Sequence, residues 1–427
     1  MRHLPRAIHG YTPRKRSVSA LVILACTATT PALAVDVGSD TTIGGLVFFD
    51  VSNISLQNED KTGKKVDTPP NGFGFDVKRF YLIVDHKFND VWSANLTTDA
   101  QYSTAATTSV VTPPSTPGGS PGTVNALTSQ TTSGGVTELM IKRLYLQAKF
   151  DPRFIVRAGS YDMPWDPFVE SLYGYRYVEK LTTDRLGFSN TTDWGANVGG
   201  AFGDHDLLSY SLSAVNGGGY KNPTRTKYVD FEGRVAVKPV PWLTAGVGYY
   251  SGHLGQVNAT NQDFPTNKAS RIDAVLGVVF QGLRVGAEYF EAKNYKTVKD
   301  LATSAYGTSS IVTSSGKAPV SDKADGFSGW VSYAFAQNTW SVFARYDEAK
   351  LSKDVAPDLK DKYFNVGVAY KPIKQLDFAL VYKKEKVDNG SASISAGNAN
   401  GSILIGGATG TTNGTYDEVG VFSRWAF

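Results

Sequence analysis

The fold of this chain is decided by an alternating run, WSANLTTD at Trp92–Asp99. Successive side chains of an extended chain point to opposite faces, so one face of this run carries Trp, Ala and Leu while the other carries four polar side chains. The same alternation recurs in LSYSLSA at Leu208–Ala214 and in LDFALVYK at Leu376–Lys383. A two-residue repeat with one apolar face is typical of β-strands.

Sixteen such runs are predicted as strands, and the connections between them alternate between short and long. The runs begin near Thr41, Phe75, Val91, Glu138, Phe154, Asp193, Leu207, Asp230, Leu243, Ser270, Leu283, Gly326, Thr339, Tyr363, Leu376 and Tyr416. Asn89-Asp90 is a short connection. Residues 103–137, 163–192, 294–322 and 388–415 form long ones that are rich in Gly, Ser, Thr and Pro, as solvated loops are.

This rhythm of connections favours a barrel in a membrane over a soluble sandwich. Outer-membrane barrels have an even number of strands, short periplasmic turns, long outer loops and apolar side chains on the outside. Lipid offers the backbone no hydrogen-bond partners, so the sheet must close on itself. For residues 35–427 the sequence therefore predicts an all-β fold, a 16-stranded antiparallel transmembrane β-barrel. A barrel of this size encloses a water-filled lumen.

The first 34 residues are typical of a cleaved signal peptide. A basic segment, Arg14-Lys15-Arg16, precedes an apolar centre at Ala20–Ala25, and Ala32-Leu33-Ala34 has the small-residue pattern of a cleavage site. We expect cleavage after Ala34 and export through the periplasm. A lipoprotein signal at Cys26 is the alternative, although Leu24 is larger than the usual residue there.

Composition excludes several other classes of function. The 427 residues include 43 basic and 39 acidic ones, and five of the basic residues lie among the first 34, where there is no acid. The rest is nearly neutral, so no nucleic-acid partner is indicated. Cys26 is the only cysteine and histidines are few, which argues against disulfides and metal sites. No hydrolase, metalloprotease or phosphate-loop motif is present, and we expect no catalytic residues, metal or cofactor.

Two local patterns support the hairpin interpretation. KRFYL at Lys78–Leu82 recurs as KRLYL at Lys142–Leu146. Alternation places the arginine and the tyrosine of each copy toward the lumen and the two apolar residues toward lipid. The last predicted strand ends in SRWAF at Ser423–Phe427. A terminal phenylalanine behind alternating apolar residues is typical of outer-membrane barrels, and we expect it to lie in the aromatic girdle.

Four segments carry a resemblance to a known family. They are KRFYL at Lys78–Leu82, FNDVWSANLTTDA at Phe88–Ala100, VRAGSYDMPW at Val156–Trp165 and FVESLYGYRY at Phe168–Tyr177. With them the chain resembles the phosphate-selective porin O/P family of Gram-negative outer membranes. The resemblance implies a 16-stranded barrel, a homotrimer, and a third outer loop, Met163–Thr192, that folds into the pore as its constriction.

A pore selects by its radius and by the fixed charge at its narrowest point. Alternation places eight arginines and seven acids toward the lumen: Arg79, Arg143, Arg157, Arg234, Arg271, Arg284, Arg345 and Arg424, against Asp85, Asp99, Glu232, Asp273, Glu288, Asp347 and Glu418. The third loop adds Asp166, Glu170, Glu179 and Asp184 against Arg176, Lys180 and Arg185. The candidate pore-lining residues are these arginines without Arg424, together with Asp166, Glu170, Arg176, Lys180 and Arg185. The near balance of the wall argues against an anion-only lumen.

Several alternatives remain open at this point. Each wall arginine either contacts solutes or forms an ion pair that holds adjacent strands. Tyr173, Tyr175 and Tyr177 either pack the loop or form a stacking track for sugars. We expect an outer-membrane porin for passive diffusion of small hydrophilic solutes and ions, with anions such as phosphate among them. The alternatives are a barrel with a blocked lumen that binds a partner, and a soluble secreted β-protein.

Overall fold

The computed structural model describes residues 35–36, 40–60, 62–104, 108–110, 128–130, 135–223, 225, 227–255, 268–295, 321–395, 402–407 and 412–427. Residues 1–34, the predicted signal peptide, lie outside the described residues, as do parts of several outer loops. Sixteen long antiparallel strands form the main sheet: β2 Thr41–Glu59, β4 Gly72–Lys87, β5 Trp92–Thr104, β8 Gly135–Asp151, β9 Phe154–Asp162, β10 Thr192–Phe202, β11 Leu208–Val215, β12 Asp230–Val240, β13 Leu243–Gly252, β14 Ala269–Phe280, β15 Leu283–Lys293, β16 Lys323–Phe335, β17 Trp340–Lys350, β18 Lys360–Ile373, β19 Leu376–Asp388 and β22 Gly414–Ala426.

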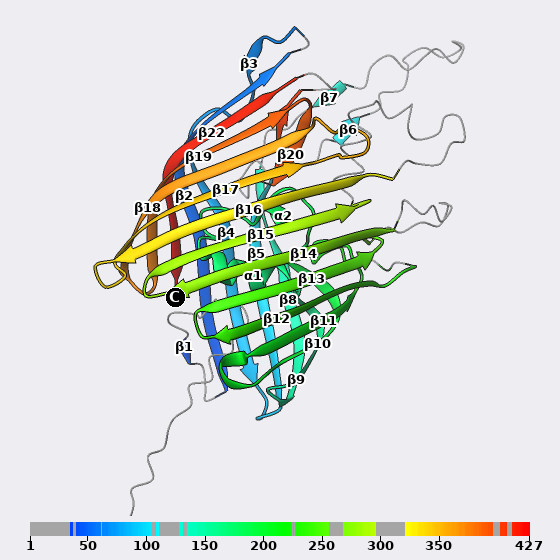
Figure 1. The fold of residues 1–427 in the computed structure, drawn as a ribbon, viewed down its shortest axis with the longest axis vertical. Coiled ribbons are helices and arrows are strands. Elements are labelled where there is room, and N and C mark those ends of the chain that lie inside the picture. Colours follow the sequence, from blue (N-terminus) through cyan, green and yellow to red (C-terminus); the bar gives the residue numbers. More distant parts are fainter. Residues whose placement is uncertain are drawn as a thin grey trace, which may run out of the picture.

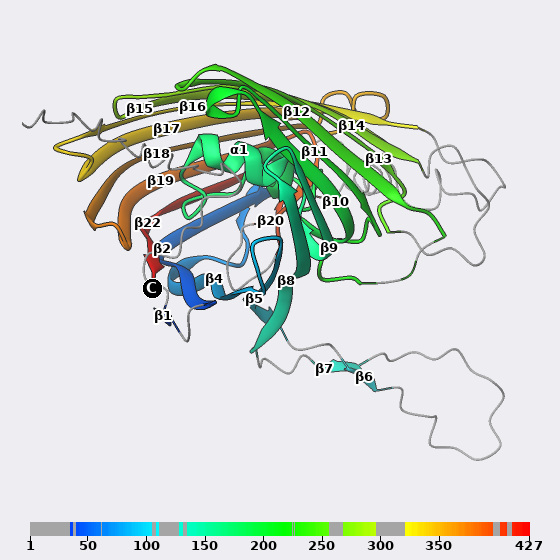
Figure 2. The same ribbon diagram turned by 90° about the horizontal axis from the view of Figure 1, so that it is seen from below.

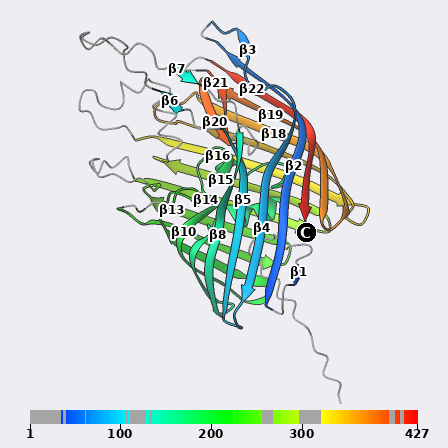
Figure 3. The same cartoon turned by 180° about the vertical axis from the view of Figure 1, so that it is seen from behind.

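The sheet closes on itself to form a barrel. Each strand pairs with its neighbours along the chain, and the last strand, β22, pairs both with β19 and with β2. The first and last strands lie side by side in Figures 1 and 3. The predicted 16-stranded antiparallel barrel is therefore confirmed, and each predicted strand begins within about three residues of an observed one.

The short turns lie at one end of the barrel, and the local sequence favours each of them. Between β14 and β15, Gln281 and Gly282 both have positive φ, 47° and 85°, which is the geometry of a two-residue hairpin turn. Between β4 and β5, the Asn89 side-chain oxygen accepts hydrogen bonds from the backbone N–H groups of Val91 and Trp92. The opposite ends of the strands carry the longer connections, so the two rims differ as the sequence predicts.

The two faces of the sheet differ in polarity. Leu82, Leu144 and Leu146 lie on the outside and are 37–44% exposed. Arg79 and Asp99 lie on the inside, where they are nearly buried. An apolar exterior around a polar interior is the arrangement that a bilayer requires. Within the described ranges, no helix is long and apolar enough to cross a membrane.

Smaller elements complete the fold. They are β1 Val35–Asp36, β3 Lys65–Asp67, the pair β6 Thr108–Val110 and β7 Thr128–Gln130, the pair β20 Ser391–Ser395 and β21 Ser402–Gly406, the helices α1 Asp166–Tyr173 and α2 Thr182–Arg185, and the 3₁₀ turn η1 Asp204–Asp206. Ile394 and Ile405 of the β20–β21 hairpin share a buried apolar cluster with Leu56, Phe188 and Phe290. This cluster packs the hairpin against the lumenal wall and against the loop that carries the two helices.

Candidate pore constriction

The connection between β9 and β10, residues 163–191, folds into the barrel, as Figure 2 shows for its helix α1. A proline in the first turn, Pro167, favours the start of α1 because its missing N–H has no helical partner there. Gly174 ends the helix with φ 83°, and a Cβ atom at this position would lie 3.0 Å from Nε of Arg284. Glycine therefore fits both the backbone and the close approach of the wall.

Four arginines of the wall hold this loop by its backbone. They extend from β12, β14, β15 and β17 and donate hydrogen bonds to loop carbonyl oxygens: Arg234 to Pro164 (3.0 Å), Arg271 to Phe188 (2.6 Å), Arg284 to Ser171 (2.7 Å) and Leu172 (2.8 Å), and Arg345 to Lys180 (2.6 Å). Charged donors make stronger hydrogen bonds than neutral ones. The loop is thus fixed along the β12–β17 side of the lumen.

The acids of that wall are covered by the loop. Glu232, Asp273, Glu288 and Asp347 are at most 2% exposed. Asp273 and Asp347 pair with the arginines on their own strands, Arg271 at 2.8 Å and Arg345 at 2.7 Å. Glu232 and Glu288 accept hydrogen bonds from the backbone and indole N–H groups of Trp165. Their charges are therefore screened from a solute in the lumen by the loop and its partners.

Arg185 at the end of α2 is the loop's own contribution to this network. Its guanidinium pairs with Asp361 of β18 at 2.9 Å and with Asp347 of β17 at 3.3 Å, and it also contacts Glu385 of β19. All four side chains are at most 1% exposed. This end of the loop is consequently joined to three consecutive strands.

The opposite wall carries two pairs of adjacent cations that face the lumen. The cross-strand register shifts by one residue at Lys78 of β4 and again at Lys142 of β8. Each shift is a β-bulge, which lets two consecutive residues lie on the same face. Lys78 and Arg79 are both nearly buried inside the barrel, and Lys142 lies beside Arg143 in the same way. The repeated Lys-Arg pattern thus produces a repeated structural feature.

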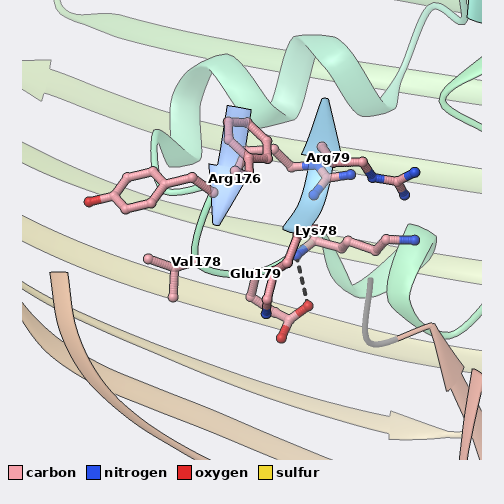
Figure 4. A pocket seen from close by; sticks show the side chains of 8 residues that line it. Lys78, Arg79, Arg176, Val178 and Glu179 are labelled. Atoms are coloured by element: carbon pink, nitrogen blue, oxygen red, sulfur yellow. Dashed lines mark hydrogen bonds between the residues drawn. The ribbon is translucent and has the colours of Figure 1, made fainter. Parts of the chain in front are cut away.

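The loop and the Lys78–Arg79 bulge of β4 meet around a small pocket that is partly open to solvent. Figure 4 shows Lys78 and Arg79 from β4 together with Arg176 and Glu179 from the loop. Phe48, Tyr177, Val178 and Lys180 complete the lining. Here the loop lies against β2 and β4, and this is the candidate constriction.

Most cations around the pocket form ion pairs with acidic side chains. Lys78 pairs with Asp50 at 2.9 Å and Arg79 with Asp99 at 2.8 Å. Within the loop, Arg176 pairs with Glu170 (2.5 Å) and Asp184 (3.3 Å), and Lys180 pairs with Asp184 (3.3 Å). Lys142 differs, since among the described residues no carboxylate lies within ion-pair distance of it. Its ammonium group lies 3.2 Å from the hydroxyl of Tyr81.

Burial and neighbouring charges shift the protonation equilibria of the loop. Burial lowers the pKa of Lys180 to about 8, and Arg79, Arg176 and Lys221 add to this effect while Asp184 opposes it. Burial alone would raise the pKa of Asp184, but Lys180, Arg176 and Arg79 outweigh burial and hold that pKa below its usual value. Burial thus dominates the shift at Lys180, whereas the neighbouring cations dominate the shift at Asp184.

The structure divides the predicted site residues into three groups. Arg79, Arg176 and Lys180 line the pocket, and Glu170 pairs with Arg176. Arg143 and Arg157 bond to Asp162 and Gln147 of the wall. The others contact the loop from behind or fix it to the wall: Asp166, Arg185, Arg234, Arg271, Arg284 and Arg345. Asp166 itself accepts hydrogen bonds from the hydroxyls of Thr183 and Ser189. The last group supports the constriction without lining it.

Sequence reasoning missed Lys78 and Lys142. Strict alternation points both side chains outward, because Arg79 and Arg143 point inward. A lysine facing lipid at mid-membrane costs roughly 2–4 kcal/mol, so the repeated Lys-Arg pair is itself a signal of a bulge. Lys383 of β19 was also missed, and it pairs with Glu179 of the loop at 3.2 Å and with Glu418 at 3.1 Å.

The loop tyrosines pack and do not form a free track. Tyr173 and Tyr177 are buried. Tyr175 stacks on Phe343 of β17, with ring centres 4.2 Å apart, and its hydroxyl lies 2.9 Å from that of Ser341. Of the two interpretations of these residues, this geometry favours packing against the wall.

Comparison with known proteins places the fold. No protein-family model matches the chain, and no curated protein matches it. Solved structures do match. The anion-selective porin from Comamonas acidovorans is 14% identical, with a TM-score of 0.54 over 91% of this chain and 99% of that one.

Two further solved structures give similar values. Outer-membrane expressed OmpT of Vibrio cholerae is 11% identical, with a TM-score of 0.51 over 92% of this chain and 100% of that one. Salmonella typhi OmpF in complex with daunomycin is 12% identical, with a TM-score of 0.51 over 90% of this chain and 98% of that one. The chain therefore shares the fold of Gram-negative outer-membrane porins. At such identities the likeness concerns the fold alone.

Proposed function

We propose that this chain is an outer-membrane porin, a water-filled channel for passive diffusion of small hydrophilic solutes and ions in which anions are preferred. The observation that carries the proposal is the loop at residues 163–191. It lies inside a closed 16-stranded barrel and faces the cationic bulge of β4 across a small pocket, and a second such bulge lies on β8 of the same wall. Such a channel needs no cofactor and no energy input.

Segregation of charge inside the barrel is the argument for anions. Counted along the wall, arginines and acids are nearly balanced, and the loop covers four of each. The excess of positive charge therefore comes from the bulges of β4 and β8, which add Lys78 and Lys142 to the lumenal face. Lys78 and Lys142 lie on the lumenal face opposite the covered acids, and among the described residues no carboxylate pairs with Lys142. Fixed charge of this kind at the narrowest point acts on a passing ion. The low-dielectric walls of a narrow passage focus the electric field of such charges on the ions inside it. Phosphate is one anion that fits this chemistry, and the family resemblance of the sequence suggests it.

The cellular setting belongs to the same proposal. An apolar exterior, an aromatic girdle and the export signal expected at residues 1–34 support insertion into the outer membrane after passage through the periplasm. We propose a homotrimer, because the sequence resemblance implies it. Outer-membrane lipid and small solutes are then the partners of the chain.

Planar-bilayer recording of the purified, folded protein tests the proposal. Stepwise openings are expected, with current carried mainly by chloride. Phosphate added to one side is expected to reduce the chloride current, and no reduction would exclude phosphate while leaving the anion preference intact. Folded, heat-modifiable protein that never opens would contradict the channel and indicate a barrel with a blocked lumen that binds a partner.

A further inference from the structure

The outside of the barrel carries a band of lysines at the ends of β15–β19 that adjoin the long loops. These five strands lie side by side in the wall seen in Figure 1. The band comprises Lys293 of β15, Lys323 of β16, Lys350 of β17, Lys360 and Lys362 of β18, and Lys384 and Lys386 of β19. Alternation places each on the same face as the exposed apolar residues of its strand, while neighbours such as Ala292 and Ala349 are buried inside.

The register brings several of these lysines directly opposite one another. Lys293 pairs with Lys323, Lys350 with Lys360, and Lys362 with Lys386. Like charges directly opposite on one face of a sheet destabilise it. Three such pairs on adjoining strands therefore call for compensating negative charge.

Acids in the same region compensate only part of this charge. Lys353 of the adjoining loop pairs with Glu291 and Asp325. Asp388 pairs with Lys362 and Lys386, and Asp417 pairs with Lys384. Asp325 lies directly opposite Lys350, and Asp388 directly opposite Lys360. Even so, no described carboxylate lies within ion-pair distance of four lysines of the band, namely Lys293, Lys323, Lys350 and Lys360.

The position of the band relative to the aromatic girdle shows which layer of the membrane it faces. Tyr289, Phe327, Tyr346, Phe364 and Tyr382 lie on the same outward face of the same strands. The lysines lie two or four residues from them toward the long-loop end of each strand, which is about 7–13 Å along a strand. Since girdle aromatics mark the edge of the hydrocarbon layer, the band lies at the level of lipid headgroups.

Of the sixteen long strands, only β15–β19 carry described outward lysines at this end. At the same end of β4, β8 and β12, the outward residues are Phe73, Phe75, Leu139 and Phe231, all more than half exposed. A general need for solubility would distribute charge around the whole rim. The confinement of lysines to β15–β19 instead indicates a specific surface that faces anionic lipid.

We propose that this lysine band binds the phosphate groups of a phosphorylated glycolipid in the outer leaflet. The proposal rests on the proposed placement in the outer membrane. Each lysine near an anionic surface attracts it, and a bisphosphorylated headgroup can bridge opposed lysines that no carboxylate compensates. The apolar chains of the lipid then lie against the girdle and the apolar wall below.

Native mass spectrometry of the detergent-purified protein with bisphosphorylated lipid A tests this. The test variant is K293Q/K323Q/K350Q/K360Q, and the matched control is K87Q/K238Q/K371Q/K374Q, which removes the same formal charge near the short-turn end. Wild type and control are expected to retain lipid A, and the test variant to bind it roughly tenfold more weakly or worse. A variant with arginine at the same four positions is expected to restore binding, which controls for folding.

Four results would overturn the proposal: equal retention by the test variant, equal loss by the control, equal binding of zwitterionic phosphatidylethanolamine, or displacement of lipid A by millimolar inorganic phosphate. The last would identify a site for free anions. Bilayer conductance of the same preparations separates the two proposals. Selective lipid A binding by a protein that never conducts would support the lipid site and reject the porin, whereas normal conductance without lipid A selectivity would do the reverse.

Discussion

Arg185 of the loop and Asp361 of β18 form an ion pair with 2.9 Å between their side-chain atoms, although they lie 176 residues apart in the sequence. The same guanidinium contacts Asp347 and Glu385, and it lies over the ring of Tyr363 at 4.5 Å. None of these groups is open to solvent. The position of the loop in the lumen thus depends on one cation that neutralises acids from three strands.

Replacing that cation is expected to release the end of the loop. Arg185→Leu leaves two buried carboxyl groups, those of Asp361 and Glu385, without their cationic partner, while Asp347 keeps Arg345. Removing one member of a buried ion pair typically costs about 3–5 kcal/mol. We expect a lower free energy of unfolding in urea, and noisier, larger single-channel currents. Arg153→Ala is the control, because its pair with Asp151 is exposed and is worth about 0–1 kcal/mol. Unchanged unfolding and currents in Arg185→Leu would show that the loop is held by other contacts.

Lys142 is expected to contribute directly to selectivity. No described carboxylate pairs with it, and Tyr81 lies close to its ammonium group. Lys142→Gln keeps a hydrogen-bonding group and removes the charge, so the barrel should remain folded. One unit charge acts with about 1 kcal/mol at 4 Å even in water, which corresponds to roughly a fivefold fall in the ratio of chloride to potassium permeability. Lys149→Gln, on the same strand nearer the short turn, should leave that ratio almost unchanged.

The lowered pKa of Lys180 gives the selectivity a pH dependence. With a pKa of about 8, this lysine is mostly protonated at pH 7 and mostly neutral at pH 9.5. Anion preference should therefore fall as the pH rises through this range. In Lys180→Gln the fall should be absent and the preference at pH 7 should already be reduced. A wild-type fall that persists in the variant would assign the titration to another group.

Closure of the barrel depends on Phe427 and Gly45. Their backbones exchange two hydrogen bonds, 2.7 and 3.0 Å long, and the Phe427 ring covers Gly45, where a Cβ atom would lie 2.2 Å from it. Gly45→Val is expected to displace the ring at a cost of about 1–3 kcal/mol and to lower the yield of heat-modifiable barrel. Gly329→Val is the matched control, since nothing lies within 4 Å of a Cβ atom there. Equal yields from both variants would contradict this role.

The strands could be predicted from the sequence because alternation is a local signal. Each lumenal or lipid-facing position in a strand such as Leu376–Asp388 follows from the polarity of its neighbours. The even count and the alternation of short and long connections then led to a closed barrel. Turn residues such as Asn89 and Gly282 fixed the boundaries, since their side-chain and backbone preferences act within a few residues.

The constriction could be predicted only in part. The loop and its charged residues were identified, but the partner of each charge depends on contacts between strands that are far apart in sequence. Alternation treated Arg271 and Arg345 as lumenal charges of the same kind as Arg79, whereas they hold loop carbonyls. Lys78 and Lys142 were missed because a bulge breaks the alternation on which the prediction relied.

The reversal potential of the open channel in a gradient of potassium chloride tests the central claim most directly. If the covered acids and the cationic bulges set the field at the constriction, the potential takes the sign of a chloride-selective pore, and Lys142→Gln moves it toward zero. A reversal potential at zero or of the potassium-selective sign, in folded wild-type protein at pH 7, would contradict the account.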